Sequence, residues 1–293
     1  MTILVTGATG HIGGRVAEIL VERGAAVRRL ARDPVKVPKL GGAPVVRGDF
    51  ADPASLVAAM DGIDTVFLVS AVGPPLKRAS LHGNVIDAAA AVHVRRLVYL
   101  SFQSASATSP FPYSAAHLLT EAHLKQSGLA FTNLRDSFYL DILPEMVDAK
   151  GTIRGPAGSG KVAWVAREDV AQVVTSALTE DRHQGQTYDV TGPEAFGLEN
   201  AAKRLSALTG GAVRYEEETP EATRKSLTAI GWPDHEVDAG VGSYLAIRSG
   251  ELSRTSDTVE RLTGRKAMSL EAYFATYPER LGALALRWPS SRT

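Results

Sequence analysis

A glycine-rich turn close to the start of the chain connects an apolar segment to an amphipathic one. Residues 3–6 (ILVT) are apolar and largely β-branched, and from residue 12 to 22 apolar side chains recur at helical spacing. Between them stands the heptapeptide GATGHIG, whose glycines allow a sharp turn, the close approach of an anion and close packing of a helix on a strand. Unpaired N–H groups and the dipole at the start of such a helix attract phosphate. The turn therefore predicts a phosphate-binding site, and a purely structural turn is the alternative. The residues of this predicted site are Gly7, Ala8, Thr9, Gly10, His11, Ile12 and Gly13.

Strand-like and helix-like segments alternate through the first half of the chain. Residues 64–70 (DTVFLVS) are almost entirely apolar, as expected for a strand that helices cover on both faces. Gly24 stands where a helix end requires a positive φ, and Asp52 followed by Pro53 is typical of a helix start. Repeated strand–helix units predict an α/β fold of Rossmann type with a doubly wound parallel sheet. The predicted strands are 3–6, 27–31, 45–47, 64–70, 96–101, 130–134 and 186–190.

The alternation loosens after the sixth of these strands. Four glycines fall within residues 151–160, which indicates turns, and residues 162–165 are predicted as one more strand. We predict a dinucleotide-binding Rossmann core over residues 1–150, with returning segments near 160–192. Residues 193–293 are predicted to form a smaller, mainly helical lobe on the substrate side, so that ligands lie in the cleft between the two parts. Helices are predicted in the later part of the chain at 167–178, 200–208, 221–230, 237–248 and 270–277.

The composition excludes several classes of protein. The chain has no cysteine, which rules out disulfides, thiolate metal sites and cysteine nucleophiles. Its 32 basic and 32 acidic residues provide no general basic surface for nucleic acid or an anionic membrane. No apolar run approaches the roughly 20 residues of a membrane helix, and the first residues lack the basic start of a secretory signal. The histidines show no metal-ligand spacing. We therefore expect a cytoplasmic protein without a metal, for which a homodimer or a protein partner stays open.

The ends of the second and fourth predicted strands indicate which dinucleotide binds. A carboxylate after the second strand binds a ribose 2′-hydroxyl, whereas a 2′-phosphate favours arginine. This chain has Arg32 there, with no acid before it and Asp33 after it. NADP(H) is therefore favoured over NAD(H), and the alternative for Arg32 is an ordinary solvated cation. After the fourth strand, Val69, Ser70 and Ala71 are expected to line the ribose and the nicotinamide.

The motif around the turn is shared with a known superfamily. Residues 6–13 (TGATGHIG) resemble the TGATGxxG motif of extended and atypical short-chain dehydrogenases/reductases. Four further segments are similar to the NmrA-like family within it: HLLTE (117–121), SGLAFTNLR (127–135), REDVA (167–171) and LTGR (262–265). That family includes NAD(P)H-dependent quinone oxidoreductases and azoreductase-like proteins, and also redox-sensing regulators without enzymatic activity. The resemblance implies that Asp49 and Phe50, after the third strand, line the adenine pocket.

Ordinary members of this superfamily protonate a carbonyl oxygen with the tyrosine of a Tyr-x-x-x-Lys pair, whose lysine lowers the tyrosine pKa. The matching positions here are Tyr113 and His117, one helical turn apart, and Ser101 ends the preceding strand, where we expect it at the cofactor. Because a neutral imidazole does not replace the ammonium group, Tyr113 is predicted either as the proton donor or as a structural residue at a helix start. A quinone acceptor dispenses with a strong acid, since hydride transfer yields a stabilised hydroquinone anion that solvent, Tyr113 or His117 can protonate.

Aromatic side chains are predicted to form the substrate pocket. Phe138, Tyr139 and Trp164, with Trp232 or Tyr244, are candidates to hold a flat substrate, and packing in the core is the alternative for each. We therefore predict an NAD(P)H-dependent oxidoreductase that reduces a quinone or an aromatic, polyketide-like carbonyl compound, with bacterial secondary metabolism as a setting. Two alternatives are a tailoring enzyme for a polycyclic aromatic substrate (a ketoreductase or an accessory to a hydroxylation) and a non-catalytic NAD(P)-sensing regulator.

Overall fold

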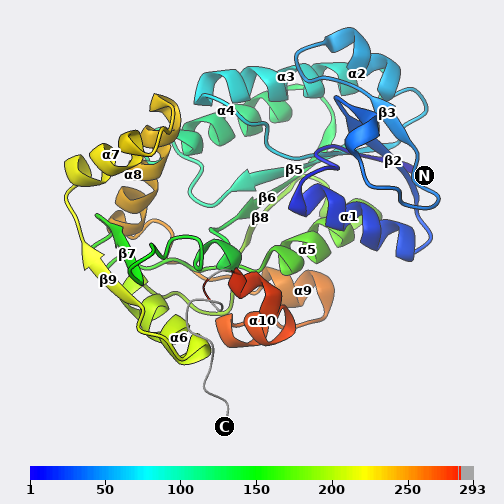
Figure 1. Ribbon diagram of the computed structural model, residues 1–293. Helices are drawn as coiled ribbons and strands as arrows, with labels where there is room; N and C mark the ends of the chain where they lie inside the picture. The colour runs from blue at the N-terminus through cyan, green and yellow to red at the C-terminus, as the bar shows by residue number, and fades with distance from the viewer. Residues whose placement is uncertain (283, 285–293) are drawn as a thin grey trace.

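Seven strands form one sheet at the centre of the computed structural model (Figure 1), which describes residues 1–282 and 284. The strand order is β3-β2-β1-β4-β5-β6-β8, and every neighbouring pair is parallel. The order changes direction between β1 and β4, which places a ligand crevice at the carboxyl ends of these strands. The predicted doubly wound parallel sheet is therefore confirmed. Its strands are β1 (Thr2–Val5), β2 (Ala26–Ala31), β3 (Val45–Arg47), β4 (Thr65–Leu68), β5 (Arg96–Phe102), β6 (Ala130–Asp136) and β8 (Gln186–Val190).

Helices cover both faces of this sheet (Figure 1). α1 (His11–Glu22) and α5 (Arg167–Thr179) pack together on one face, where their apolar side chains share a core with the sheet. α2 (Pro53–Ala59), α3 (Pro75–Ala91) and α4 (Pro112–Gln126) cover the other face. Because both faces are covered, all residues of β4 and β5 are buried.

Two helix ends form as their sequences predict. Asp52 Oδ1 accepts a hydrogen bond from the N–H of Ser55 at 3.3 Å, and Pro53 is the first residue of α2. Gly24, directly beyond the end of α1, has a φ of +74°, which lies in the left-handed region that favours glycine. These local interactions begin and end the helices without help from distant parts of the chain.

The later part of the chain adds helices and a second, two-stranded sheet. β7 (Thr152–Gly155) pairs in parallel with β9 (Arg214–Glu217), so the segment after β6 is built together with residues beyond 193. The predicted division of the chain at residues 150 and 193 stays a prediction. None of the described helices is long and apolar enough to cross a membrane. The remaining helices are α6 (Leu198–Thr209), α7 (Pro220–Ala229), α8 (Asp234–Ser249), α9 (Thr258–Thr263) and α10 (Leu270–Thr276), with 3-10 helices at Pro34–Lys36, Leu140–Ile142, Asp181–His183 and Pro278–Leu281.

Some predictions for this later part need correction. Residues 162–165 do not form a strand, because Val162 and Val165 make only single bridges, to Phe196 and Tyr139. The segment is fully buried, and an apolar run alone does not distinguish a strand from another buried segment. The glycine-rich segment contains β7, and its partner β9 escapes prediction because RYEE has little apolar pattern. The short helix α9, which packs on α5, is also not predicted.

Candidate cofactor and substrate site

The glycine-rich turn has the geometry of a phosphate cradle. Gly7 leaves β1 with a φ of +62°, and the N–H of Gly10 donates to the Gly7 carbonyl oxygen at 2.9 Å. A methyl group on Gly13 would lie 2.3 Å from that same oxygen, so this position requires glycine. Thr9, Gly10 and His11 are exposed, and α1 begins without a side-chain cap. The N–H groups of the first turn of α1 are therefore available to an anion.

The turn lies directly beside the end of β4. The N–H of Val69 donates to Thr6 Oγ1 at 3.0 Å, and a Cβ on Gly7 would lie 3.2 Å from the Cβ of Val69. Ser70 and Ala71 follow as half-buried residues at the same edge of the sheet. The structure thus places Val69, Ser70 and Ala71 next to the turn, as predicted for residues that would line a bound dinucleotide. Ala8 and Ile12, the two apolar residues of the turn, are buried in the core behind it.

Arg32 follows β2 directly, and its side chain is exposed. Its guanidinium makes no hydrogen bond or ion pair within the described part of the chain. The neighbouring carboxylate of Asp33 accepts from the N–H of Val35 at 3.2 Å and lies 3.4 Å from Lys36 Nζ. The carboxylate that would bind a 2′-hydroxyl is thus engaged locally, while the arginine stays open to a ligand.

Asp49 and Phe50 stand at the end of β3, near the same edge. Asp49 Oδ1 accepts from the N–H of Ala51 at 2.9 Å, and the N–H of Asp49 donates to Ser55 Oγ at 3.0 Å. The half-buried Phe50 packs against the core under α2 and α3, and its carbonyl oxygen accepts from Asn84 Nδ2 at 2.8 Å. These contacts hold the segment after β3 in one conformation. A contact of either residue with adenine stays a prediction.

Ser101 has a different role from the one its position suggests. It is 1% exposed, and its hydroxyl donates to Glu121 Oε1 at 2.5 Å. Arg135 donates to both oxygens of the same carboxylate, at 2.8 and 2.6 Å. The hydroxyl of Ser101 thus belongs to a network that joins β5, β6 and α4, and a contact of Ser101 with the cofactor stays a prediction.

Tyr113 and His117 both lie on α4, but they contact different partners. The guanidinium carbon of Arg78 lies 3.7 Å from the centre of the Tyr113 ring. His117 is 7% exposed, and its Nδ1 lies 2.8 Å from the hydroxyl of Tyr99. Burial is the largest cause that lowers the pKa of His117, and the nearby His82 and Arg78 lower it further, to about 3. The imidazole is therefore neutral. No hydrogen bond joins Tyr113 to His117 in the described structure, and the pair therefore does not reproduce a Tyr–Lys dyad.

Two residues of α3 that are not predicted from the sequence contact this edge of the sheet. Arg78 Nε donates to the Gly73 carbonyl oxygen at 2.9 Å, and its Nη1 lies 3.3 Å from Ser70 Oγ. His82 Nε2 accepts from the N–H of Ala71 at 2.8 Å. The signal for both is their spacing of four residues on the helix that follows β4, since this spacing puts two polar side chains on one helical face.

Aromatic rings form a chain behind the ends of β5 and β6. The ring centre of Phe138 lies 5.2 Å from that of Phe102, 5.5 Å from that of Phe111 and 6.2 Å from that of Trp164. Trp164 is 1% exposed, and its Nε1 donates to the Phe196 carbonyl oxygen at 3.0 Å. Trp164 is therefore a core residue and not part of a pocket wall, which corrects its predicted place. Phe138 and Tyr139 are half-buried, and their contact with a substrate stays a prediction.

The other predicted aromatic residues are dispersed. The hydroxyl of Tyr139 donates to the buried carboxylate of Asp136, and burial raises the pKa of that carboxyl to about 7. Tyr244 packs so closely on the backbone that a Cβ on Gly155 would lie 2.4 Å from its ring. Trp232, 42% exposed, lies between α7 and α8. A contact of these side chains with a substrate stays a prediction.

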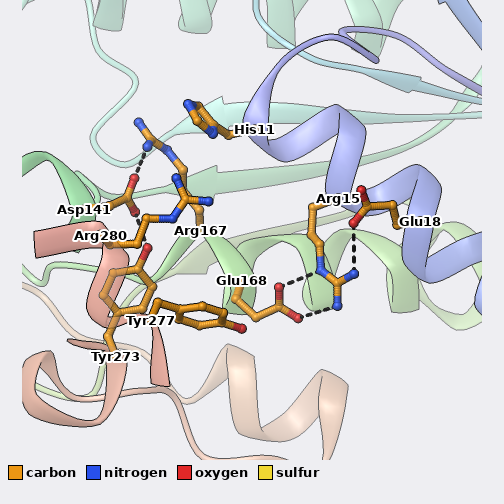
Figure 2. Close-up of a pocket in the computed structure, with 9 residues that line it drawn as sticks. All are labelled: His11, Arg15, Glu18, Asp141, Arg167, Glu168, Tyr273, Tyr277 and Arg280. Atoms are coloured by element: carbon orange, nitrogen blue, oxygen red, sulfur yellow. Dashed lines mark hydrogen bonds and ion pairs between the residues drawn. The ribbon is translucent and has the colours of Figure 1, made fainter. Parts of the chain in front are cut away.

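A polar cavity of about 210 Å³ opens beside the start of α1 (Figure 2). Glu168 accepts from Arg15 through both of its carboxylate oxygens, at 2.8 and 3.3 Å, and Asp141 pairs with Arg167. Burial is the largest cause that lowers the pKa of His11, and Arg167 and Arg280 lower it further. The cavity is therefore rich in paired charges and differs from the aromatic pocket that the sequence predicts. Its lining residues are His11, Arg15, Glu18, Asp141, Arg167, Glu168, Tyr273, Tyr277 and Arg280.

Comparison with known proteins agrees with the fold and the turn. A sequence family described as NAD(P)H-binding matches residues 7–181, and the chain belongs to this family. The NAD(P)H azoreductase of Xenophilus azovorans is 32% identical over 286 residues, which cover 96% of this chain and 99% of that protein. The (4-alkanoyl-5-oxo-2,5-dihydrofuran-3-yl)methyl phosphate reductase of Streptomyces griseus subsp. griseus is 34% identical over 284 residues, which cover 94% of this chain and 98% of that protein.

A solved structure extends the comparison to three dimensions. The NADPH-dependent quinone oxidoreductase of Escherichia coli, complexed with NADPH, matches with a TM-score of 0.86 at 31% identity and covers 94% of this chain and 100% of that one. The predicted resemblance to the NmrA-like family is confirmed, and so is the predicted class. The chain is an NAD(P)H-dependent oxidoreductase.

Proposed function

We propose that the protein reduces quinones and similar flat, conjugated acceptors with a hydride from NADPH. The observation that carries this proposal is the neutral, Tyr99-bonded His117 at the position where a Tyr–Lys acid would have its ammonium group. An isolated carbonyl needs an acid to take up the charge of an alkoxide, whereas a quinone spreads that charge over a hydroquinone anion. The names of the quinone oxidoreductase and azoreductase relatives support acceptors of the same class.

The residues present fit a dinucleotide. Because a Cβ on Gly13 would collide with the Gly7 carbonyl oxygen, only glycine there lets α1 start this close to β1, and the first-turn N–H groups of α1 would hold the pyrophosphate. Residues 69–71 would line the ribose and the nicotinamide, and Phe50 would contact the adenine. When bound, the nicotinamide supplies the hydride. The chain's own part is to orient both ligands at the edge of β4 and β5 and to hold the acceptor in place.

Turnover of a panel of acceptors tests the proposal. Purified protein is mixed with NADPH and a benzoquinone, a naphthoquinone or a simple aromatic ketone, and loss of NADPH absorbance is followed. We expect turnover with the quinones and little with the ketone. Equal rates with the ketone would favour a ketoreductase instead. Tight NADPH binding without turnover of any acceptor would favour the regulator.

The preference for NADPH over NADH is assigned to Arg32. A charge-assisted contact of this kind contributes about 1.5–3 kcal/mol. Arg32→Ala should therefore raise the KM for NADPH about tenfold to a hundredfold and leave the KM for NADH unchanged. Arg224→Ala, which removes an exposed arginine of α7, serves as the matched control. Equal effects of Arg32→Ala on both cofactors would contradict the assignment.

A further inference from the structure

Two buried histidines form a hydrogen-bonded chain between the end of β4 and α4. His82 of α3 is 1% exposed, His117 of α4 is 7% exposed, and the hydroxyl of Tyr99 on β5 lies between their rings. The hydroxyl is 2.8 Å from Nδ1 of His117 and 3.4 Å from Nδ1 of His82. Because each of these groups donates or accepts in only certain ways, the contacts limit where the protons of this hydrogen-bonded series lie.

The proton of His82 lies on Nδ1. The backbone N–H of Ala71 only donates, so Nε2 of His82, at 2.8 Å from it, accepts. Nδ1 of His82 lies 2.8 Å from Thr120 Oγ1, and the single proton of that hydroxyl goes to the Ala116 carbonyl oxygen, also at 2.8 Å. Thr120 therefore accepts from His82 Nδ1. The contacts of His82 with Ala71 and with Thr120 thus both require the tautomer that carries its proton on Nδ1.

The proton of His117 consequently lies on Nε2. Nδ1 of His82 carries a proton and cannot accept from the Tyr99 hydroxyl. Thr120 also acts on this hydroxyl, but Nδ1 of His117, at 2.8 Å, is the acceptor to which we assign its proton. A neutral imidazole that accepts at Nδ1 is a donor at Nε2. Within the described residues, this Nε2 has no hydrogen-bond partner, and it is not one of the atoms sealed from solvent. The Nε2–H therefore lacks an acceptor within the described residues, and His117 keeps 7% of its surface exposed.

The position of this N–H matches the reacting end of the crevice. The ring of His117 lies between that of Tyr99, with centres 5.8 Å apart, and that of Phe102 at the carboxyl end of β5, 6.0 Å away. At the other end of the hydrogen-bonded series of side chains, His82 accepts from the N–H of Ala71 at the end of β4. In open parallel sheets, ligands bind outside these strand ends.

We propose that His117 is a catalytic residue that donates its Nε2–H, without releasing the proton, to the acceptor oxygen on which negative charge develops, and that Tyr99 is a positioning residue that holds this tautomer. The proposal rests on the proposed quinone reduction. In that reaction the acceptor would gain two electrons as a hydride: the C–H bond of the reduced nicotinamide would break, a bond from that hydrogen to the acceptor would form, and the oxidised cofactor would be the other product. The acceptor becomes a hydroquinone anion, which then takes one proton from solvent.

The surroundings keep His117 neutral in the range where the enzyme would work. Burial is the largest cause of its lowered pKa, and His82 and Arg78 of α3 act in the same direction. Tyr99 faces the ring from β5, and Glu236 of α8 acts on Arg78. Protonation of His117 is thus confined to strongly acidic solution, and the turnover number should show no histidine titration between about pH 5 and pH 8.

Three variants and one control test the proposal on the full chain with NADPH and a naphthoquinone. His117→Phe keeps a flat ring but removes the donor, and His117→Gln keeps an N–H at the place of Nε2. Loss of one donor to a developing oxyanion lowers kcat about a hundredfold, so we expect this loss in His117→Phe and a smaller one in His117→Gln. Tyr99→Phe should lower kcat about fivefold, the effect of one ordinary hydrogen bond. His123→Gln changes an exposed histidine of the same helix and should leave kcat unchanged.

Two readouts separate these roles from a structural one. The Kd for NADPH should stay within about twofold in all variants, because none of these side chains belongs to the phosphate turn. Nitrogen NMR of the imidazoles should show His117 with its proton on Nε2 in the wild type and a mixture of tautomers in Tyr99→Phe. If the wild type turns over quinones but His117→Phe retains kcat within twofold, or if His117 carries its proton on Nδ1, the inference is wrong and the proposed function stands. If the wild type turns over no quinone, both are wrong.

Discussion

Gly13→Ala probes the phosphate cradle at the position where the backbone leaves no room for a side chain. The added Cβ would lie 2.3 Å from the Gly7 carbonyl oxygen and 2.6 Å from that of Thr6, and both contacts are with backbone that holds the turn. Relief of such a contact requires the start of α1 to move away from the end of β1. Forced overpacking of this kind costs about 1–3 kcal/mol.

The same strain should appear in stability and in cofactor binding. Because the N–H groups of the displaced turn are those that would bind the pyrophosphate, we expect the Kd for NADPH to rise about fivefold to 150-fold. The assay is calorimetric titration of NADPH, with the free energy of unfolding measured in urea. The matched control is Gly14→Ala, one residue along the same helix, where the added Cβ meets its nearest atom, the Ala8 oxygen, at 3.4 Å.

The control should behave in the opposite way. Gly14 lies within α1, so alanine there improves helix propensity and should raise the free energy of unfolding by up to about 1 kcal/mol. NADPH binding should not change. If Gly13→Ala and Gly14→Ala bind NADPH equally well, the cradle is not the phosphate site and the reasoning from its geometry fails.

Two further predictions concern Tyr113 and Asp136. Tyr113→Phe should leave kcat for a naphthoquinone within about threefold, because the Tyr113 hydroxyl is not part of the chain that ends at His117; a hundredfold loss in steady-state kinetics would instead identify Tyr113 as the acid. Burial raises the pKa of Asp136 to about 7, above its value in the unfolded chain. The stability that this carboxyl contributes is therefore full below about pH 4 and is lost as the pH rises through about 7. Asp136→Asn should reduce the difference in free energy of unfolding between about pH 5 and pH 8; urea unfolding curves that keep the wild-type difference would contradict the assignment.

The sequence predicts those parts of the structure that depend on neighbours along the chain. The spacing of Gly7, Gly10 and Gly13 defines the turn locally, and the apolar runs define strands that helices cover on both faces. The place of Arg32 directly after β2 is also predictable, whereas its contact with a 2′-phosphate stays a prediction. These features together are sufficient for the fold class and for the cofactor end of the site.

The features that the sequence does not predict depend on distant partners. The pairing of β7 with β9 joins segments that no local pattern connects. The hydroxyl of Ser101 donates to Glu121, and Trp164 is packed in the core, although the sequence predicts both residues as part of the ligand site. The hydrogen bonds from His82 through Tyr99 to His117 join α3, β5 and α4. The tautomers of the two histidines can therefore be inferred only from the three elements together.

Calorimetric titration of the purified protein with NADPH and with NADH tests the central claim most directly. We expect saturable binding of one NADPH per chain, at least about tenfold tighter than that of NADH, since Arg32 would contact the 2′-phosphate. If neither nucleotide gives a heat of binding and neither raises the Tm, the assignment of the turn as a dinucleotide site is wrong.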